Sequence, residues 1–166
     1  VVRPRNAAIP TRREQNTIEL NIAEPVHLSV EFDGDIKRPL YVFANPPEDR
    51  PAHSDNLIYF GPGKIHRPGK IDLKSGETLF IAGGAIVQGY IRAENAENIR
   101  IIGPGILDAS HRRDQKITSI LLRACRDVTI RDTLLIDSFG WGVRNYSAIS
   151  CMPSASTAIG TSTMCQ

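Results

Sequence analysis

Long apolar runs, metal-ligand spacings and clustered charge are all scarce in these 166 residues. No apolar segment approaches the roughly 20 residues that a transmembrane helix needs, so no membrane span is expected. The first residues, Val1-Val2-Arg3-Pro4-Arg5, hold no initiator Met and no apolar stretch typical of a signal peptide. The sequence is therefore expected to come from the interior of a longer protein.

Residue patterns that bind metals or nucleic acids are also scarce. The three cysteines are an odd number without metal-ligand spacing, and the histidines are isolated from one another, so neither a metal nor a cofactor is expected. The net charge is only +2, and the basic residues are scattered along the chain rather than gathered in a stripe. A nucleic-acid partner is therefore not expected.

Helical periodicity is nearly absent, and short apolar runs between Gly, Pro, Asn and Asp predict an all-β chain. Residues 17–22 and 26–32 alternate between apolar and polar side chains, and 39–44 is a third candidate strand. Such alternation is typical of antiparallel strands with one wet face. Residues 1–50 are predicted to be the remnant strands of an N-terminal β-sandwich, followed by a proline-rich linker.

A twelve-residue pattern recurs at 78–89, 98–109 and 127–138, with offsets of 20 and 29 residues. Its apolar positions align in four columns: Leu79, Ile99 and Val128; Ile81, Ile101 and Ile130; Ile86, Ile106 and Leu135; Val87, Leu107 and Ile136. One repeat cannot bury its apolar column alone, but copies stacked about 4.8 Å apart can.

The repeats therefore predict a right-handed parallel β-helix of about three to four coils over residues 51–146. Cys125 is predicted to lie in a column of small inward residues, which explains its presence without a chemical role. Trp141 is predicted to begin the fourth coil. After Tyr146 the pattern fades, and residues 147–166 are predicted to be a disordered or altered tail rich in Ser and Thr. An uncapped end of such a helix would favour self-association.

Several motifs resemble one family of enzymes. They lie at residues 33–35, 39–48, 59–63, 75–85 and 101–108. Over residues 1–146 the chain resembles bacterial glycoside hydrolases of the pectin-lyase-like superfamily, namely polygalacturonase-like and dextranase-like enzymes. The resemblance implies a β-sandwich ahead of the β-helix, a polysaccharide substrate, hydrolysis of O-glycosyl bonds by carboxylates, and a secreted or periplasmic location.

The catalytic aspartates of that family lie one to two coils beyond a stretch that matches Asp137-Ser138-Phe139-Gly140-Trp141, and no Asp or Glu follows it here. The chain is therefore expected to be a fragment of such a hydrolase that is inactive alone. An alternative is a non-catalytic β-helix module that binds carbohydrate or serves as a scaffold. A polysaccharide lyase is less favoured, because no acidic cluster suited to Ca²⁺ is evident.

Asp108 and Asp137 occupy one predicted column and are the only weak catalytic candidates. Stacked carboxylates can serve as the acid and base of a glycosidase, but the favoured interpretation is that each caps the turn after its strand. Three residues are candidates for substrate binding. Trp141 offers either a platform for sugar rings or a core residue. Arg92 and Arg123, predicted to stack on one exposed face, suit either an anionic polysaccharide or plain solvent.

Overall fold

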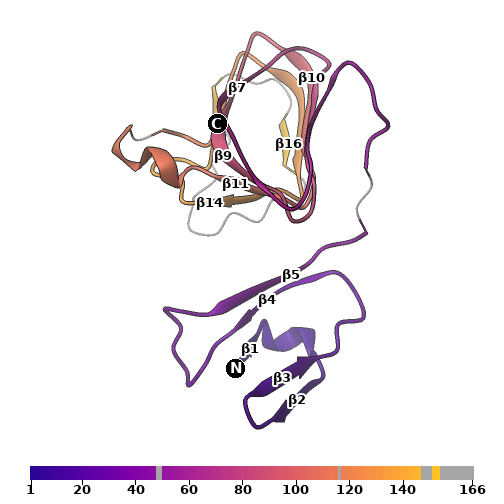
Figure 1. Cartoon of the computed structure of the whole chain (residues 1–166), viewed down its shortest axis with the longest axis vertical. Coiled ribbons are helices and arrows are strands. Elements are labelled where there is room, and N and C mark those ends of the chain that lie inside the picture. Colours follow the sequence, from indigo (N-terminus) through magenta and orange to yellow (C-terminus); the bar gives the residue numbers. More distant parts are fainter. Residues whose placement is uncertain (48–49, 116, 147–150, 154–166) are drawn as a thin grey trace. The chain divides into compact units, whose positions relative to one another are not determined.

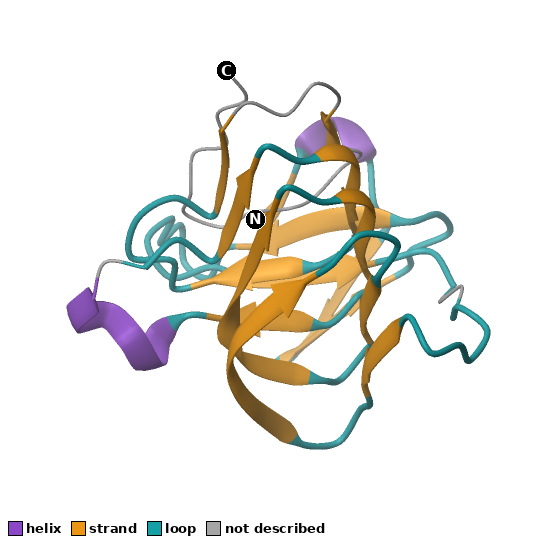
Figure 2. Ribbon diagram, turned by 90° about the horizontal axis from the view of Figure 1, so that it is seen from above, coloured by secondary structure: helices purple, strands orange, loops and turns teal. Residues whose placement is uncertain are grey.

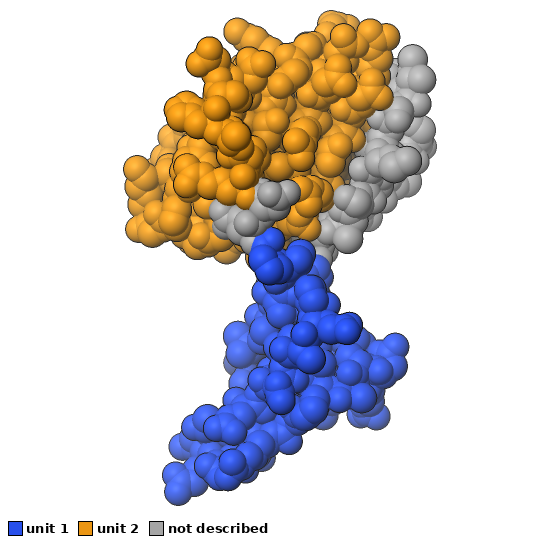
Figure 3. Space-filling view, turned by 90° about the vertical axis from the view of Figure 1, so that its right-hand side faces the viewer, with its two compact units in different colours: residues 1–47 blue, residues 48–166 orange. Residues whose placement is uncertain are grey.

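The computed structural model describes residues 1–47, 50–115, 117–146 and 151–153. Within these residues the protein is all-β apart from two short 3-10 helices, η1 (Arg5–Ala7) and η2 (Ser110–Gln115) (Figure 1). The chain divides into two compact units, Val1–Pro47 and Glu48–Gln166 (Figure 3). No helix in the described part of the chain is long and apolar enough to cross a membrane.

Unit 1 contains only antiparallel pairs. A three-stranded sheet has the order β1 (Val2–Arg3), β4 (Val26–Val30), β5 (Leu40–Ala44), and a hairpin joins β2 (Thr11–Glu14) to β3 (Thr17–Leu20). Leu28 and Val30 are buried, as the alternation predicts. Phe32 was predicted to share their face but is 50% exposed, because it lies beyond the end of β4, at the turn that contains Asp33.

Unit 2 contains two curled sheets whose strands are all parallel (Figures 1 and 2). The first sheet has the order β16 (Cys151–Pro153), β13 (Arg126–Arg131), β10 (Glu97–Ile102), β8 (Thr78–Ile81), β6 (Leu57–Phe60). The second has the order β14 (Leu134–Ile136), β11 (Ile106–Asp108), β9 (Ile86–Glu94), β12 (Ile120–Arg123), β15 (Val143–Tyr146), and β7 (Ile65–Leu73) also pairs with β9. The chain passes repeatedly between the two sheets, so each strand stacks on one from an earlier or later passage.

The core of unit 2 lies between these sheets. Ile99 and Ile101 from one sheet and Val87, Ile91 and Leu107 from the other are all completely buried within a single apolar cluster. Cys125 belongs to the same cluster, as its place in the predicted small-residue column requires. Of the tail expected at 147–166, only β16 belongs to the described residues.

The register confirms part of the predicted columns: the pairs Ile99–Val128, Ile101–Ile130, Ile86–Ile106 and Val87–Leu107. Leu79, however, pairs with Ile101 and not with Ile99. This shift of two residues leaves every side chain on its predicted face, because side chains in a strand alternate with a period of two. The prediction that Leu79 points inward is therefore confirmed, but the prediction that its neighbour is Ile99 is wrong.

A shift of one residue has a larger effect after the third turn. Leu135, and not Ile136, pairs with Leu107. Leu135 is accordingly 1% exposed in the core, while Ile136 points to the other face. Both shifts arise where the chain passes between the sheets. Five residues separate Phe80 from Ile86, three separate their partners Ile102 and Ile106, and two separate Arg131 from Leu134. A repeat of fixed length therefore cannot predict the register across connections of five, three and two residues.

The turn at residues 103–105 also lies very close to the backbone of β8. Gly103 has a φ of +110°, and a Cβ built there would lie 2.3 Å from the carbonyl oxygen of Ile81. A Cβ at Gly105 would lie 2.2 Å from Cγ2 of Ile81. Two glycines are therefore required where this turn packs on the preceding strand.

Replacing Gly103 should destabilise unit 2 more than replacing a glycine with similar backbone geometry and open surroundings. Gly76 has a φ of +78° and nothing within 4 Å of its virtual Cβ. We expect Gly76→Ala to cost about 1 kcal/mol through backbone strain alone. Gly103→Ala should cost about 3 kcal/mol, because a steric clash adds to that strain. Urea unfolding followed by the fluorescence of Trp141, the single tryptophan, reports on unit 2. Equal losses for the two variants would show that the close approach to Ile81 is unimportant.

Candidate functional site

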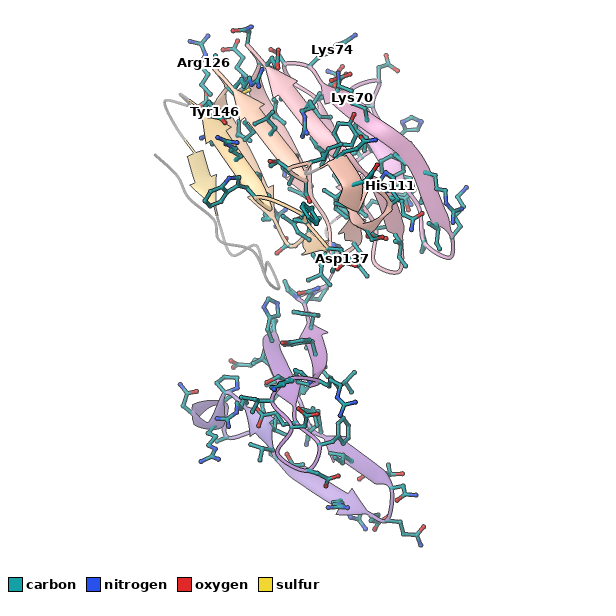
Figure 4. All side chains as sticks on the ribbon, turned by 90° about the vertical axis from the view of Figure 1, so that its left-hand side faces the viewer. Lys70, Lys74, His111, Arg126, Asp137 and Tyr146 are labelled. Atoms are coloured by element: carbon teal, nitrogen blue, oxygen red, sulfur yellow. The ribbon has the colours of Figure 1, made fainter. Side chains whose placement is uncertain are left out.

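The outward face of the second sheet carries a groove of about 490 Å³. That volume falls within the roughly 300–1,000 Å³ of sites that bind small molecules. The groove is built on β7, β9 and β12, and its side chains include Lys70, Asp72, Tyr90, Arg92, Glu94, Ile117, Leu121 and Arg123. Figure 4 faces this surface, with Lys70 of β7 and Tyr146 of β15 on strands at opposite sides of the sheet and His111 of η2 in front.

Strict alternation along β9 places the groove side chains. Ile91 and Ala93 point inward and are buried, whereas Tyr90 and Arg92 point outward and are half-buried and Glu94 is exposed. The same alternation in β7 buries Ile71 and Leu73 and turns Lys70 and Asp72 outward. Each strand therefore contributes its polar residues to the groove because its apolar residues are needed in the core.

Arg92 is the most constrained residue of the groove. Its Nη1 donates hydrogen bonds to the carbonyl oxygens of Ile91, at 2.8 Å, and Thr118, at 2.9 Å. Its guanidinium carbon lies 4.6 Å from the centre of the Tyr90 ring, within the range of a cation–π contact. Burial lowers the pKa of Arg92 from its ordinary value, but an arginine stays charged at neutral pH. The groove thus holds a fixed positive charge beside an aromatic ring.

Two ion pairs flank Arg92. Lys70 and Asp72 are 2.8 Å apart, and Arg123 and Glu94 are 3.3 Å apart. The hydrogen bond to Asp72 raises the pKa of Lys70 above its ordinary value. All four side chains are more than half exposed, so each pair adds little to stability. Their main consequence is the pattern of charge that they present to a ligand.

The predicted stacking of Arg92 on Arg123 is wrong. Arg92 pairs with Leu121 on β12, and Arg123 pairs with Glu94 on β9. The prediction assumed an offset of 31 residues, whereas the strands pair with an offset of 29. Both arginines still point to the same face and line the same groove. The groove therefore has alternating charges rather than a continuous positive column.

Asp108 is buried, with 6% of its surface exposed, and both of its carboxylate oxygens accept hydrogen bonds. Gln88 donates to Oδ2 at 3.0 Å, and the amide of Ser110 donates to Oδ1 at 2.8 Å. Burial alone would raise the pKa of Asp108, but the hydrogen bonds from Ser110 and Gln88 and the nearby His111 outweigh it and lower the pKa below its ordinary value. Gln88 in turn accepts a hydrogen bond from Arg67. These contacts favour the turn-capping interpretation of Asp108.

Asp137 does not share a column with Asp108, contrary to the prediction. Asp108 pairs with Ile136, and Asp137 follows the end of β14 with a φ of 53° and an exposed side chain. The one-residue shift at the preceding turn is the cause. The pair of stacked carboxylates considered from the sequence is therefore not formed in this register.

Trp141 lies before β15, and its side chain is half-buried. Its carbonyl oxygen accepts a hydrogen bond from the amide of Ser119 at 3.2 Å, which aligns β15 with β12. It is not among the residues that line the groove. Its predicted role in binding sugar rings stays a prediction.

Sequence reasoning missed Lys70, Asp72, Glu94 and Leu121 as residues of the groove. The available signal was the alternation of Lys70-Ile71-Asp72-Leu73, which repeats the pattern of Tyr90-Ile91-Arg92-Ala93. These two segments pair residue for residue. Among the described residues there is no group of three or more His, Cys, Asp or Glu side chains arranged to hold a metal ion.

Neither the protein-family models nor the curated proteins searched match this chain. Among solved structures, the chain is similar to a crystal structure from Parabacteroides merdae of a protein provisionally assigned as a glycosyl hydrolase. The TM-score is 0.51 and the sequence identity 24%, over 55% of this chain and 54% of that chain. This chain thus spans about half the length of that structure, and the similarity concerns the fold.

Asp108→Asn should destabilise unit 2 by about 1–3 kcal/mol at pH 7, because an amide cannot accept from both donors and one of them then faces an NH₂ group. The folded-state pKa of Asp108 lies below the unfolded value of about 3.9, so its contribution is present above that pH and is lost as pH falls through the folded-state pKa. Urea unfolding at several pH values should show the difference between variant and wild type shrinking in acid.

The exposed Asp114 on η2 provides the matched control. Asp114→Asn should leave stability within about 0.5 kcal/mol of wild type across the same pH range. A difference between Asp108→Asn and wild type that stays constant down to the lowest pH would contradict the assignment of an ionised, hydrogen-bonded carboxylate.

Proposed function

We propose that this chain is the polysaccharide-binding part of a glycoside hydrolase-type protein, and that unit 2 forms coils of a right-handed parallel β-helix. The observation that carries the proposal is the groove on the outward face of β7, β9 and β12. It combines a half-buried aromatic ring, Tyr90, with apolar side chains and several fixed charges. The similarity in fold to the Parabacteroides merdae structure supports the class of protein.

The parallel register supports the β-helix. β6, β8, β10 and β13 stack in one sheet, and β7, β9 and β12 with β15 stack in the other. Successive passages of the chain therefore add one layer to each sheet, as coils do. A stack of this kind presents an outward face on which an extended polymer can lie across several strands.

Aromatic rings and apolar side chains suit the C–H faces of sugar rings, while charged groups and main-chain groups hydrogen-bond to hydroxyls. Tyr90 and Leu121 supply the first kind of contact in the groove, and Lys70, Glu94 and Arg123 supply the second. Arg92 is held by two main-chain carbonyl oxygens and needs little reordering on binding, which lowers the entropic cost of recognition.

Binding is favoured over catalysis for this chain because Asp108 is held by structural donors and does not pair with Asp137. A glycosidase acid must hold a proton near neutral pH, which requires a raised pKa. The pKa of Asp108 is lowered, and both of its oxygens are occupied by structural donors. Hydrolysis would therefore depend on carboxylates other than Asp108. A secreted or periplasmic location, and self-association through the edge of the stacked sheets, remain parts of the proposal.

Tyr90→Ala should weaken binding of a soluble polysaccharide roughly tenfold, because a stacking aromatic ring contributes about 1–2 kcal/mol. Affinity electrophoresis in gels that contain xylan, dextran or polygalacturonate measures this effect. Tyr41→Ala is the control, because Tyr41 is an aromatic residue of unit 1 and is 46% exposed. The proposal fails if no polysaccharide slows the wild-type protein, or if both variants bind as wild type does.

The purified chain should release no reducing sugar from polygalacturonate or dextran. The physical reason is that Asp108 is ionised and hydrogen-bonded and so cannot donate a proton to the leaving group, and that the register does not place Asp137 beside it as the second carboxylate. A reducing-end assay over several days, with a known hydrolase as positive control, tests this expectation. Turnover that persists in Asp108→Asn would point to another carboxylate, and turnover that Asp108→Asn abolishes would overturn the structural role given to Asp108.

A further inference from the structure

The charges of the groove do not favour a polyanion. Three cations, Lys70, Arg92 and Arg123, and two carboxylates, Asp72 and Glu94, line it, so three minus two leaves a net charge of +1. Lys70 and Arg123 are each paired with one of the carboxylates. Among the described residues no ion pair involves Arg92, whose Nη1 donates to two main-chain carbonyl oxygens instead. Of the three groove cations, Arg92 is therefore the one whose charge no carboxylate of the described residues already neutralises.

The two carboxylates stand close on either side of Arg92. Asp72 is its direct neighbour on β7, and Glu94 follows it by two residues on the same face of β9. Neighbouring strands lie about 4.8 Å apart and alternate residues about 7 Å apart, so both carboxylates act on a ligand bound at Arg92. A ligand with one acidic group can meet Arg92 alone. A ligand with an acidic group on every sugar would bring further negative charges to the pairs Lys70–Asp72 and Arg123–Glu94, where the carboxylates repel them and the cations are already paired.

The apolar part of the groove lies next to the same arginine. Leu121 is its direct neighbour on β12, and the ring of Tyr90 lies beneath its guanidinium. Both side chains are half-buried, and Ile117 is a further half-buried apolar residue of the groove. These surfaces suit uncharged sugar rings on either side of an acidic one.

We propose that the groove binds a largely neutral glycan that carries isolated carboxylates, with one carboxylate at Arg92 and uncharged sugars against Tyr90 and Leu121. This inference rests on the proposed function and narrows its substrate class. It differs from a site for a polyuronate, for which the two arginines would have had to form a continuous positive column.

Isothermal titration calorimetry of the full chain with three tetrasaccharides tests the proposal at one fixed salt concentration. The ligands are xylotetraose, xylotetraose that bears one glucuronate branch, and tetragalacturonate. We expect the branched ligand to bind roughly tenfold more tightly than unbranched xylotetraose, because a charged hydrogen bond forms at Arg92. Tetragalacturonate should bind more weakly than the branched ligand.

Two variants and a control locate the effect. Arg92→Gln should weaken binding of the branched ligand roughly tenfold more than binding of unbranched xylotetraose, so that the advantage of the glucuronate branch is lost. Arg100→Gln, at an exposed position of β10 in the other sheet, removes the same charge and should change neither affinity. The double variant Asp72→Asn/Glu94→Gln should bind tetragalacturonate at least roughly tenfold more tightly, because the repulsion is removed. Trp141 fluorescence during urea unfolding verifies that each variant is folded.

The outcomes separate the two proposals. If the neutral and branched ligands bind equally, or if tetragalacturonate binds the wild-type chain most tightly, the inference about isolated carboxylates is overturned while polysaccharide binding stands. If none of the three ligands binds and no other polysaccharide retards the chain in affinity electrophoresis, the proposed function fails and the inference fails with it.

Discussion

Register between stacked parallel strands is the constraint on which the rest of unit 2 depends. A strand such as β9 buries Val87, Ile91 and Ala93 only because β7 on one side and β11 and β12 on the other present inward side chains at the same level. Each fully buried aliphatic side chain contributes about 1.5–3 kcal/mol, and a slip of one residue would turn the whole set toward solvent. The core therefore fixes the position of every outward residue as well.

The groove is a by-product of that arrangement. The inward positions must be apolar, but the outward positions are free to vary. Because the strands are stacked, outward side chains on neighbouring strands lie in rows about 4.8 Å apart. Tyr90, Arg92 and Glu94 gain defined neighbours on β7 and β12 without any special local geometry. The insertion that contains η2 interrupts neither sheet, because it lies between the end of β11 and the start of β12 and extends from the strands (Figure 2). Function can thus change on this face while the core stays the same.

The repeat in the sequence predicted the parallel strands and the inward faces, because apolar alternation survives any shift of two residues. It failed where turn length decides the neighbour. Nothing in the spacing shows that residues 82–85, 103–105 and 132–133 form turns of different length, so Leu79 and Leu135 were given the wrong partners. The same kind of error placed Arg123 beside Arg92 instead of Glu94. An error of two residues in the predicted register does not change the predicted fold. It does change the predicted neighbour of Arg123 from a cation, Arg92, to an anion, Glu94.

Asp108 and Asp137 illustrate why catalytic carboxylates are hard to recognise from sequence in such a fold. Both follow a short apolar strand, and for both the sequence favoured a turn cap over a catalytic acid. What separates them is their surroundings: Asp108 is buried and accepts from Gln88 and Ser110, whereas Asp137 is exposed at a positive φ. The donors to Asp108 come from β9, twenty residues earlier, and from the start of η2. The protonation state of a carboxylate is set by such contacts between layers, and these become visible only when the register is known.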